Sequence, residues 1–234
     1  MKPSWVIWLT QTRNESGAKQ SRPEESQTQE QPTSRLQSRH QYFIPGVTRL
    51  YVKVPPDRIG VLIGRGGEVL KRVMERTKTK IVVDNVNCNV IIEPASPYTT
   101  PLDLMKAQDF VKAIAYGFSP ERAMRVLEED QVLIVIDLKQ YVKPSPNHLT
   151  RVKGRIIGEH GRARKNLEEM TGTYISIYDD YVAIIGDYEA ANAARDAILM
   201  LIEGRQHSTV YRHLDRVMYR IKRSRKLEYW QHQL

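Results

Sequence analysis

The chain has 234 residues, a formal net charge of +9 and 41% hydrophobic residues, which is enough apolar material for one or two small domains. Its single cysteine, Cys88, excludes an intramolecular disulfide and a cysteine-based zinc cluster. The longest early apolar stretch, residues 5–9, is too short for a secretory core or a membrane span, so we expect no membrane association and a cytoplasmic location.

The N-terminal part, residues 1–40, is rich in Gln, Ser, Thr, Arg and Glu. It contains almost no apolar residue between Gly17 and Leu36. A segment of this composition cannot bury enough apolar surface to fold, so we expect a disordered extension.

The next part, residues 46–129, carries alternating and helical apolar patterns that predict a folded domain. Its order is β-α-α-β-β-α, followed by one extra helix that starts at Ser119 and Pro120. The expected elements are strands at 50–54, 80–83 and 90–92 and helices at 59–63, 68–76, 102–115 and 119–128.

Residues 130–204 repeat the same order, which predicts a second domain of the same kind. The expected elements are strands at 132–136, 174–178 and 181–185, a loop and short helix within 146–157, and helices at 162–170 and 189–203. The fold class is therefore α+β, with two related domains in tandem.

The C-terminal part, residues 205–234, holds eight basic residues against Asp215 and Glu228. Apolar residues recur at helical spacing, which predicts a basic amphipathic helix followed by a short tail. We expect this helix to pack on the second domain; the alternative is that it reaches along a partner. The apolar positions are Tyr211, Leu214, Met218 and Ile221.

Two glycine-rich turns of the same kind are the most informative motifs. Gly64-Arg65-Gly66-Gly67 and Gly158-Glu159-His160-Gly161 lie 94 positions apart, and each follows an apolar stretch and opens a helix. Glycines permit tight dihedrals and close approach of a sugar-phosphate chain, and the following helix directs unpaired N–H groups at the turn. We expect each turn, with the apolar residues before it and the strand after its helix, to form a groove for single-stranded RNA.

Positive charge gathers around both turns, with seven basic and two acidic residues in 58–80 and six and one in 151–165. This pattern is typical of a phosphate-binding surface. Glu159 departs from it because a carboxylate repels a phosphodiester, and His160 offsets that repulsion only when protonated. The predicted RNA-binding residues are Gly64, Arg65, Gly66, Gly67, Lys71, Arg72, Gly158, Glu159, His160, Gly161, Arg162, Arg164 and Lys165.

The sequence contains no motif that predicts an enzyme. The sequence has no Walker loop, and the first turn does not follow a strand as a dinucleotide fingerprint does. The six histidines are scattered without metal-ligand spacing, and Cys88 has no nearby histidine. We therefore expect no catalytic activity, no cofactor and no metal site.

The chain resembles tandem K-homology (KH) proteins of type I over residues 48–204, on the strength of both turns in matching frames. Segments 158–164 and 204–211 are similar to those of the Dim-two/partner-of-Nob-one family, and the length resembles its archaeal branch. That resemblance implies a small-subunit ribosome assembly factor that binds pre-rRNA near the 3′ end of the 16S rRNA, with assembly proteins that include a maturation nuclease.

Eukaryotic members of that family tend to have a degraded first turn, whereas both turns are intact here, so both grooves are expected to bind RNA. The alternative function is a protein-interaction scaffold, or a translation or RNA-decay adaptor, that uses the KH folds to bind protein. The oligomeric state stays open.

Overall fold

The computed structural model describes residues 49–142 and 145–231, with only the backbone of residues 228–231. The predicted disordered extension, the start of the first predicted domain at residue 46 and the last residues of the tail lie outside the described residues. The described residues all belong to one compact unit.

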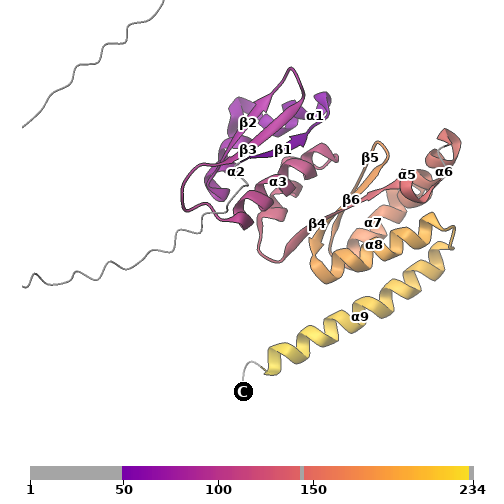
Figure 1. The fold of residues 1–234 in the computed structure, drawn as a ribbon. Coiled ribbons are helices and arrows are strands. Elements are labelled where there is room, and N and C mark those ends of the chain that lie inside the picture. The colour runs from indigo at the N-terminus through magenta and orange to yellow at the C-terminus, as the bar shows by residue number, and fades with distance from the viewer. Residues whose placement is uncertain (1–48, 143–144, 232–234) are drawn as a thin grey trace, which may run out of the picture. The chain divides into compact units, whose positions relative to one another are not determined.

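The described chain contains the predicted β-α-α-β-β-α order twice, which confirms the α+β fold class (Figure 1). The first repeat consists of β1 (Leu50–Lys53), α1 (Pro56–Ile63), α2 (Glu68–Thr77), β2 (Thr79–Asp84), β3 (Asn89–Pro94) and α3 (Pro101–Ala115). The second consists of β4 (Gln131–Asp137), α5 (Leu138–Tyr141), α6 (Pro146–Ile157), α7 (Arg162–Thr171), β5 (Tyr174–Tyr178), β6 (Tyr181–Asp187) and α8 (Tyr188–Ile202). Between them lie α4 (Pro120–Ala123) and a 3₁₀ turn (Met124–Leu127), and α9 (His207–Gln231) follows.

Several helices differ from the sequence prediction. The helix α1 begins at Pro56 rather than at residue 59, and the helix expected at 119–128 is the short α4 followed by the 3₁₀ turn. The short helix α5 was not expected, because one turn capped by the Asp137 side chain, 2.9 Å from the Lys139 N–H, is too short to show periodicity. The helix α6 begins directly at Pro146, a residue favoured at the first helical position. The tail helix α9 continues to Gln231, so most of the tail expected after it is helical as well.

The two antiparallel sheets have the same strand order, β1-β3-β2 and β4-β6-β5, but different surroundings. In the first sheet Val52 and Ile81 are buried, while Tyr51 and Val82 on the other face are exposed. In β6 the four residues from Val182 to Ile185 are all buried. A run of buried residues in a strand means that both faces of its sheet are covered.

The two faces of the second sheet belong to different cores. Val182 and Ile184 pack with α6, α7 and α8 of their own repeat. Ala183 and Ile185 belong to the core of the first repeat, with Phe110 of α3 and Val126 of the 3₁₀ turn. The second sheet is therefore a layer shared by the two repeats.

The helix α9 packs against α8 and α7, as Figure 1 shows for the yellow helix beside α8. Val210, Leu214 and Met218 are buried in the core of the second repeat. Near the far end of α9, Arg225 contacts Asp187 at 2.8 Å and Glu189 at 3.1 Å, and the bond from Arg225 lowers the pKa of Asp187. The helix is thus fixed to the second repeat along most of its length.

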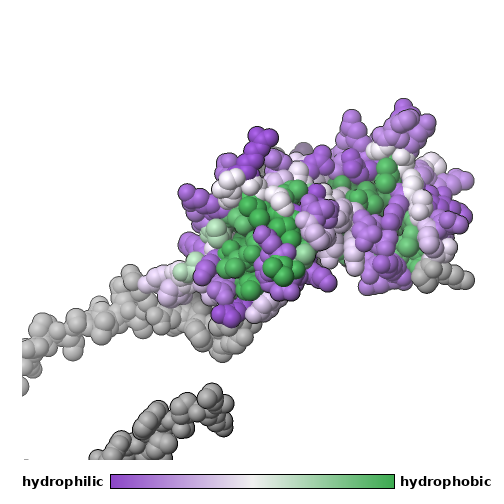
Figure 2. All heavy atoms as spheres, turned by 90° about the horizontal axis from the view of Figure 1, so that it is seen from above, coloured by the Kyte–Doolittle hydropathy of each residue, from purple (hydrophilic) through white to green (hydrophobic). Residues whose placement is uncertain are grey.

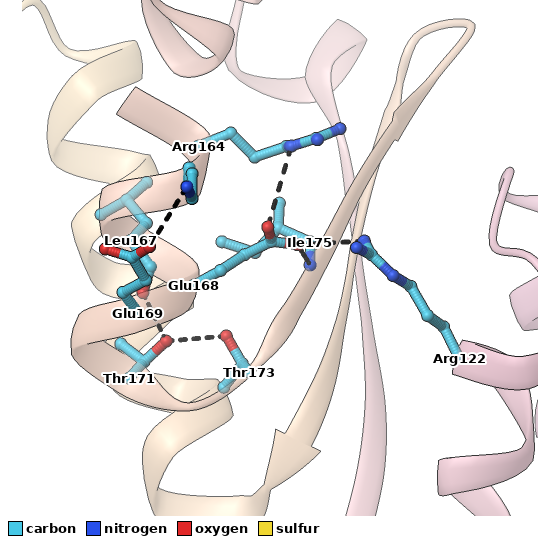
Figure 3. Close-up of polar contacts among 9 residues, drawn as sticks. Arg122, Arg164, Leu167, Glu168, Glu169, Thr171, Thr173 and Ile175 are labelled. Atoms are coloured by element: carbon cyan, nitrogen blue, oxygen red, sulfur yellow. Dashed lines mark hydrogen bonds and ion pairs between the residues drawn. The ribbon is translucent and has the colours of Figure 1, made fainter. Parts of the chain in front are cut away.

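The same pair of threonines turns the chain from the second helix of each repeat into the next strand. Thr77 donates to the Val73 carbonyl at 2.8 Å and meets Thr79 at 2.7 Å. In the second repeat, Thr171 makes the corresponding bonds to Leu167 and Thr173, both 2.7 Å (Figure 3). These hydroxyl groups are buried and satisfied, so the helix-to-strand turn is duplicated in chemistry as well as in shape.

The outer edge of β5 is held to α7 by a carboxylate. Glu168, whose side chain is 14% exposed, accepts the Ile175 N–H at 2.8 Å and lies 3.5 Å from Arg122 of the first repeat and 3.9 Å from Arg164 (Figure 3). At the equivalent place in the first repeat, the Met74 sulfur lies 3.3 Å from the Ile81 N–H. An edge-strand N–H is thus given a partner in both repeats.

We expect Glu168→Ala to lower the free energy of unfolding by about 2 kcal/mol, because it leaves the Ile175 N–H without its acceptor. The neighbouring Glu169 is the matched control, since its side chain is 64% exposed and its ion pair among the described residues is with Lys165, at 3.7 Å. Glu169→Ala should change stability by less than about 0.5 kcal/mol. Urea unfolding measures both, and equal losses would contradict the role given to Glu168.

Candidate nucleic-acid interface

The two glycine turns have the same backbone conformation. Gly64 and Gly158 have φ/ψ of 73°/177° and 73°/175°. The last glycines, Gly67 and Gly161, have 78°/10° and 77°/10°. The third residues also match, although one is Gly66 with φ 60° and the other is His160 with φ 52°. The duplication seen in the sequence therefore extends to the geometry of the two loops, residues 64–67 and 158–161.

The first and last glycines of each loop serve different needs. A Cβ on Gly64 would lie 2.4 Å from Val69 Cγ2, and one on Gly158 would lie 2.6 Å from Ala163 Cβ, so the following helix packs directly on these glycines. A Cβ on Gly67 or Gly161 would meet nothing within 4 Å. Gly67 and Gly161, the last glycines of the two loops, therefore leave open space in front of the backbone, where a ligand can approach.

The amides at the start of α2 and α7 have no side-chain cap. Neither Gly67 nor Gly161 can supply one, and no side chain accepts a capping hydrogen bond there. The first N–H groups of a helix carry partial positive charge, so an uncapped N-terminus attracts an anion.

The charges at the start of α7 reinforce this. The first four residues of α7 include three cations and the first turn has no acid, whereas α2 begins with Glu68. Cations at a helix N-terminus oppose the helix dipole and cost stability unless an anion binds there. The second loop should therefore attract an anion more strongly than the first loop does. The three cations are Arg162, Arg164 and Lys165.

The predicted cations divide into exposed and engaged side chains. Arg65, Lys71 and Arg162 are exposed and form no ion pair within residues 49–142 and 145–227. Arg72 lies 2.7 Å from Glu68, and Lys165 lies 3.7 Å from Glu169.

Arg164 is partly engaged by its own helix, whereas Glu159 is exposed: the Arg164 side chain is 41% exposed although its Nε is buried. The Arg164 Nε is buried and lies 3.9 Å from Glu168, the carboxylate that accepts the Ile175 N–H of β5 (Figure 3). Part of the positive charge of Arg164 is therefore used within the fold. Glu159 and His160 are exposed, with 3.9 Å between them. The Glu159 carboxylate, which we expect to repel phosphate, is thus exposed to solvent in the second loop.

Several basic residues near the loops hold the fold together. Arg58 donates to the carbonyls of Ile114 and Phe118 at the end of α3, and Arg155 donates to those of Leu201 and Arg205 at the end of α8. Cations suit helix C-termini because of the dipole there.

Lys153 has a comparable structural role, since it lies 2.8 Å from Asp180. Hydrogen bonds from Lys153 and then Lys139 lower the pKa of Asp180. The positive charge counted around the loops in the sequence is therefore only partly free for a ligand.

The apolar residues expected to line the grooves are mostly core. Ile59, Leu62 and Ile156 are buried. The exposed apolar side chain next to a loop is Ile157, 37% exposed, whereas Val82 of β2, 41% exposed, lies on the open face of the first sheet with Tyr51. The stretches before the loops thus contribute one accessible side chain in the second repeat and half-buried ones in the first.

A hollow of about 570 Å³ lies at the first loop, between α1, the start of α2 and the start of α4. Its lining includes Gly64 and Arg65, but also Glu68 and Glu121. The first loop thus sits in a more acidic setting than the second.

A larger cleft that the sequence does not signal lies between the repeats. It has a volume of about 660 Å³, and its lining includes Tyr51, Tyr116, Tyr178 and Tyr181. The Tyr178 hydroxyl donates to Asp57 at 2.7 Å, and the Tyr116 and Tyr181 rings are 5.0 Å apart. These tyrosines come from distant parts of the chain, so no local pattern could have grouped them.

Two kinds of site are not found in the described part of the chain. No group of three or more His, Cys, Asp or Glu side chains within residues 49–142 and 145–227 is placed to hold a metal ion. None of the described helices has the length and apolar character needed to span a membrane.

Comparison with known proteins gives matches over both repeats. A family model described as a eukaryotic-type KH domain of type I matches residues 132–219, and a KH domain model matches residues 49–97. The KH domain-containing protein MJ0443 of Methanocaldococcus jannaschii is 39% identical over 76% of this chain and 78% of its own length. The pre-rRNA-processing protein pno1 of Emericella nidulans is 33% identical over 73% of this chain and 67% of its own length.

A solved structure shares the fold. It is a chain of the a/eIF2α–aDim2p–rRNA complex from Pyrococcus horikoshii. That chain is 44% identical, with a TM-score of 0.68, over 74% of this chain and 94% of its own length.

Proposed function

Because the chain belongs to the PNO1/Dim2 family of tandem KH-domain proteins, we propose that it binds single-stranded RNA at its two loops and acts in the processing of ribosomal RNA. The type I KH model matches the second repeat, and the general KH domain model matches residues 49–97 of the first. In this proposal the protein is a binding factor without catalytic activity of its own.

The observation that carries the proposal is the second loop. An uncapped helix N-terminus, an unobstructed approach at Gly161 and three cations in the first four residues of α7 come together there. This is the arrangement that binds a phosphate through backbone amides. The first loop repeats the dihedral angles, so it supports a second contact with the same chemistry.

We propose that Arg65 and Arg162 contribute most of the exposed positive charge at the two loops, because both are exposed and form no ion pair within the described residues. Lys71 adds to the first loop. Arg72, Arg164 and Lys165 contribute less, since each faces a carboxylate of its own helix.

The RNA that we propose is the small-subunit rRNA precursor near the 3′ end of its 16S part. Two relatives support a ribosomal RNA target: one is named a pre-rRNA-processing protein and the other was crystallised with rRNA. The partners proposed with it are ribosome assembly proteins, including the nuclease that matures this end. That last step rests on the family resemblance alone.

Fluorescence anisotropy with labelled RNA tests the binding. We expect a single-stranded fragment of the 16S 3′ end to bind at least tenfold more tightly than the same sequence in a duplex. If each loop contacts two phosphates, the slope of log K against log salt is about −3. Equal affinity for the duplex, or affinity that does not change with salt, would contradict the proposal.

A protein-binding role is the second candidate, and the open face of the first sheet favours it. Tyr51 and Val82 are 61% and 41% exposed there, whereas the corresponding face of the second sheet is covered. Figure 2 shows hydrophobic side chains gathered on the first repeat among hydrophilic ones. Pull-down with a Tyr51→Ser/Val82→Ser variant separates the roles, because RNA binding at the loops should be unchanged while partner capture is lost.

A further inference from the structure

The outer face of α9 carries four arginines that are spaced three or four residues apart and so lie along one side of the helix. Val210, Leu214 and Met218 are buried on the inner side of this helix. At about 100° per residue, the four arginines lie on the opposite side within an arc of about 80° and extend along about 16 Å of helix. We call them the arginine face: Arg212, Arg216, Arg220 and Arg223.

The arginine face is not neutralised by the protein. All four side chains are exposed, and none has a carboxylate within 4.0 Å among residues 49–142 and 145–227. By contrast Arg225, two residues further on, is held by Asp187 and Glu189. Like charges four residues apart destabilise a helix, so this spacing of arginines costs stability in the free protein.

The helix that carries the arginine face begins beside the end of α6, which leads into the second loop. The His207 Nε2 lies 2.9 Å from the Arg155 carbonyl oxygen, and Arg155 donates to the Arg205 carbonyl at 2.7 Å. Arg155 stands three residues before Gly158, so the start of α9 is tied to the end of α6 where the loop begins. From there α9 runs along α8 as one continuous helix (Figure 1).

The side chains of this face suit a phosphate backbone better than bases. Arginine binds phosphate in a bidentate manner, and contacts to phosphate carry no sequence information. Among the side chains described up to residue 227, the exposed aromatic ring beside it is Tyr219, 68% exposed, and one ring offers little surface for stacking several bases.

We propose that the arginine face of α9 binds the phosphate backbone of RNA that continues from the strand held at the second loop. This inference rests on the proposed RNA binding and extends it. The loops hold a short single strand, and α9 adds sequence-independent contacts to its flank. The protein then has a higher affinity for long RNA than the two loops alone provide.

The test uses the full chain and two labelled RNAs, an octamer that fills the loops and the same octamer with twelve-nucleotide extensions at both ends. In the test variant Arg212, Arg216, Arg220 and Arg223 are replaced by Gln. We expect octamer affinity to stay within twofold, while affinity for the extended RNA falls at least tenfold. The salt slope for the extended RNA should become shallower by about 3, since each single-strand phosphate contact contributes about 0.7.

Two controls separate local contacts from net charge. Arg→Lys at the same four positions keeps the charge and should keep the salt slope. Arg216→Gln/Arg220→Gln removes two charges from the arginine face, and Arg49→Gln/Arg195→Gln removes two from residues that face carboxylates elsewhere. Only the first of these pairs should weaken binding of the extended RNA.

The outcomes distinguish this inference from the proposed function. If the wild type binds neither RNA, the proposed function itself fails. If the glutamine variant binds the extended RNA as well as the wild type does, or loses both RNAs equally, the loops still bind RNA but α9 has no local backbone contact and the inference is overturned.

Discussion

Aspartate at the two middle positions of both loops is expected to reduce the affinity for single-stranded RNA by at least 100-fold. The variant carries Arg65→Asp, Gly66→Asp, Glu159→Asp and His160→Asp. It places two carboxylates at each loop, where the proposed phosphates approach uncapped helix N-termini. A 100-fold loss corresponds to about 2.7 kcal/mol, a plausible sum of lost attraction and added repulsion at two sites.

The loops should tolerate these substitutions. Gly66 has open space where a Cβ would lie, and His160 shows that a side chain is accepted at the same left-handed backbone position. Aspartate and asparagine are among the residues that adopt this conformation most readily. Binding should therefore be lost without loss of the fold, as a thermal unfolding curve would show.

Asparagine at the same four positions is the matched control, because it has nearly the same shape and no charge. We expect this variant to keep binding at the second loop, where it also removes the repulsive Glu159 carboxylate. Anisotropy titrations of both variants give the comparison. If aspartate and asparagine variants bind RNA equally well, the loops are not the phosphate sites.

Gly158→Ala is expected to destabilise the protein by about 3 kcal/mol or more. The backbone at Gly158, with φ 73° and ψ 175°, lies in a region that is essentially restricted to glycine, which costs other residues about 1–3 kcal/mol. The added Cβ also lies 2.6 Å from Ala163 Cβ and 2.7 Å from the Ala163 backbone nitrogen. Overpacking of this kind costs a further ~1–3 kcal/mol, because neither neighbour can rotate away.

Gly154→Ala, one helical turn earlier in α6, is the matched control. Its Cβ would meet nothing within 4 Å, and the residue lies inside the helix. Alanine there should raise stability by about 0.5–1 kcal/mol, because it restricts the unfolded chain and favours the helix. Urea unfolding of the two variants should give opposite signs. Similar effects would show that the packing of α7 on Gly158 is not tight.

Much of the fold was accessible from the sequence, because its signals are local. Apolar periodicity and glycine placement gave the elements of both repeats, and the 94-residue spacing of Gly64 and Gly158 indicated the duplication that the dihedral angles confirm. Long-range packing was not accessible. Nothing in the β4–β6 segment distinguishes Ala183 and Ile185, which complete the core of the other repeat, from their neighbours.

The candidate site was predicted less completely than the fold. The sequence identified the loops, because glycine spacing is a local property. It could not tell free cations from engaged ones, since Arg58 and Arg155 meet acceptors that lie 46–60 residues away in the chain. Arg164 shows the same problem at short range, because its orientation depends on the burial of Glu168 against β5.

The sheet β4-β6-β5 is covered on one face by its own helices and on the other by α3 of the preceding repeat. The two repeats are therefore not independent domains joined by a flexible linker. The first repeat needs Ala183 and Ile185 to complete its core, and the second repeat alone would expose that face of its sheet, so we expect the protein to unfold as one cooperative unit. The separation of the two loops is consequently a constant of the folded protein. An RNA that occupies both loops must span the distance between them. The protein should therefore select RNAs whose two binding segments are separated by a matching length.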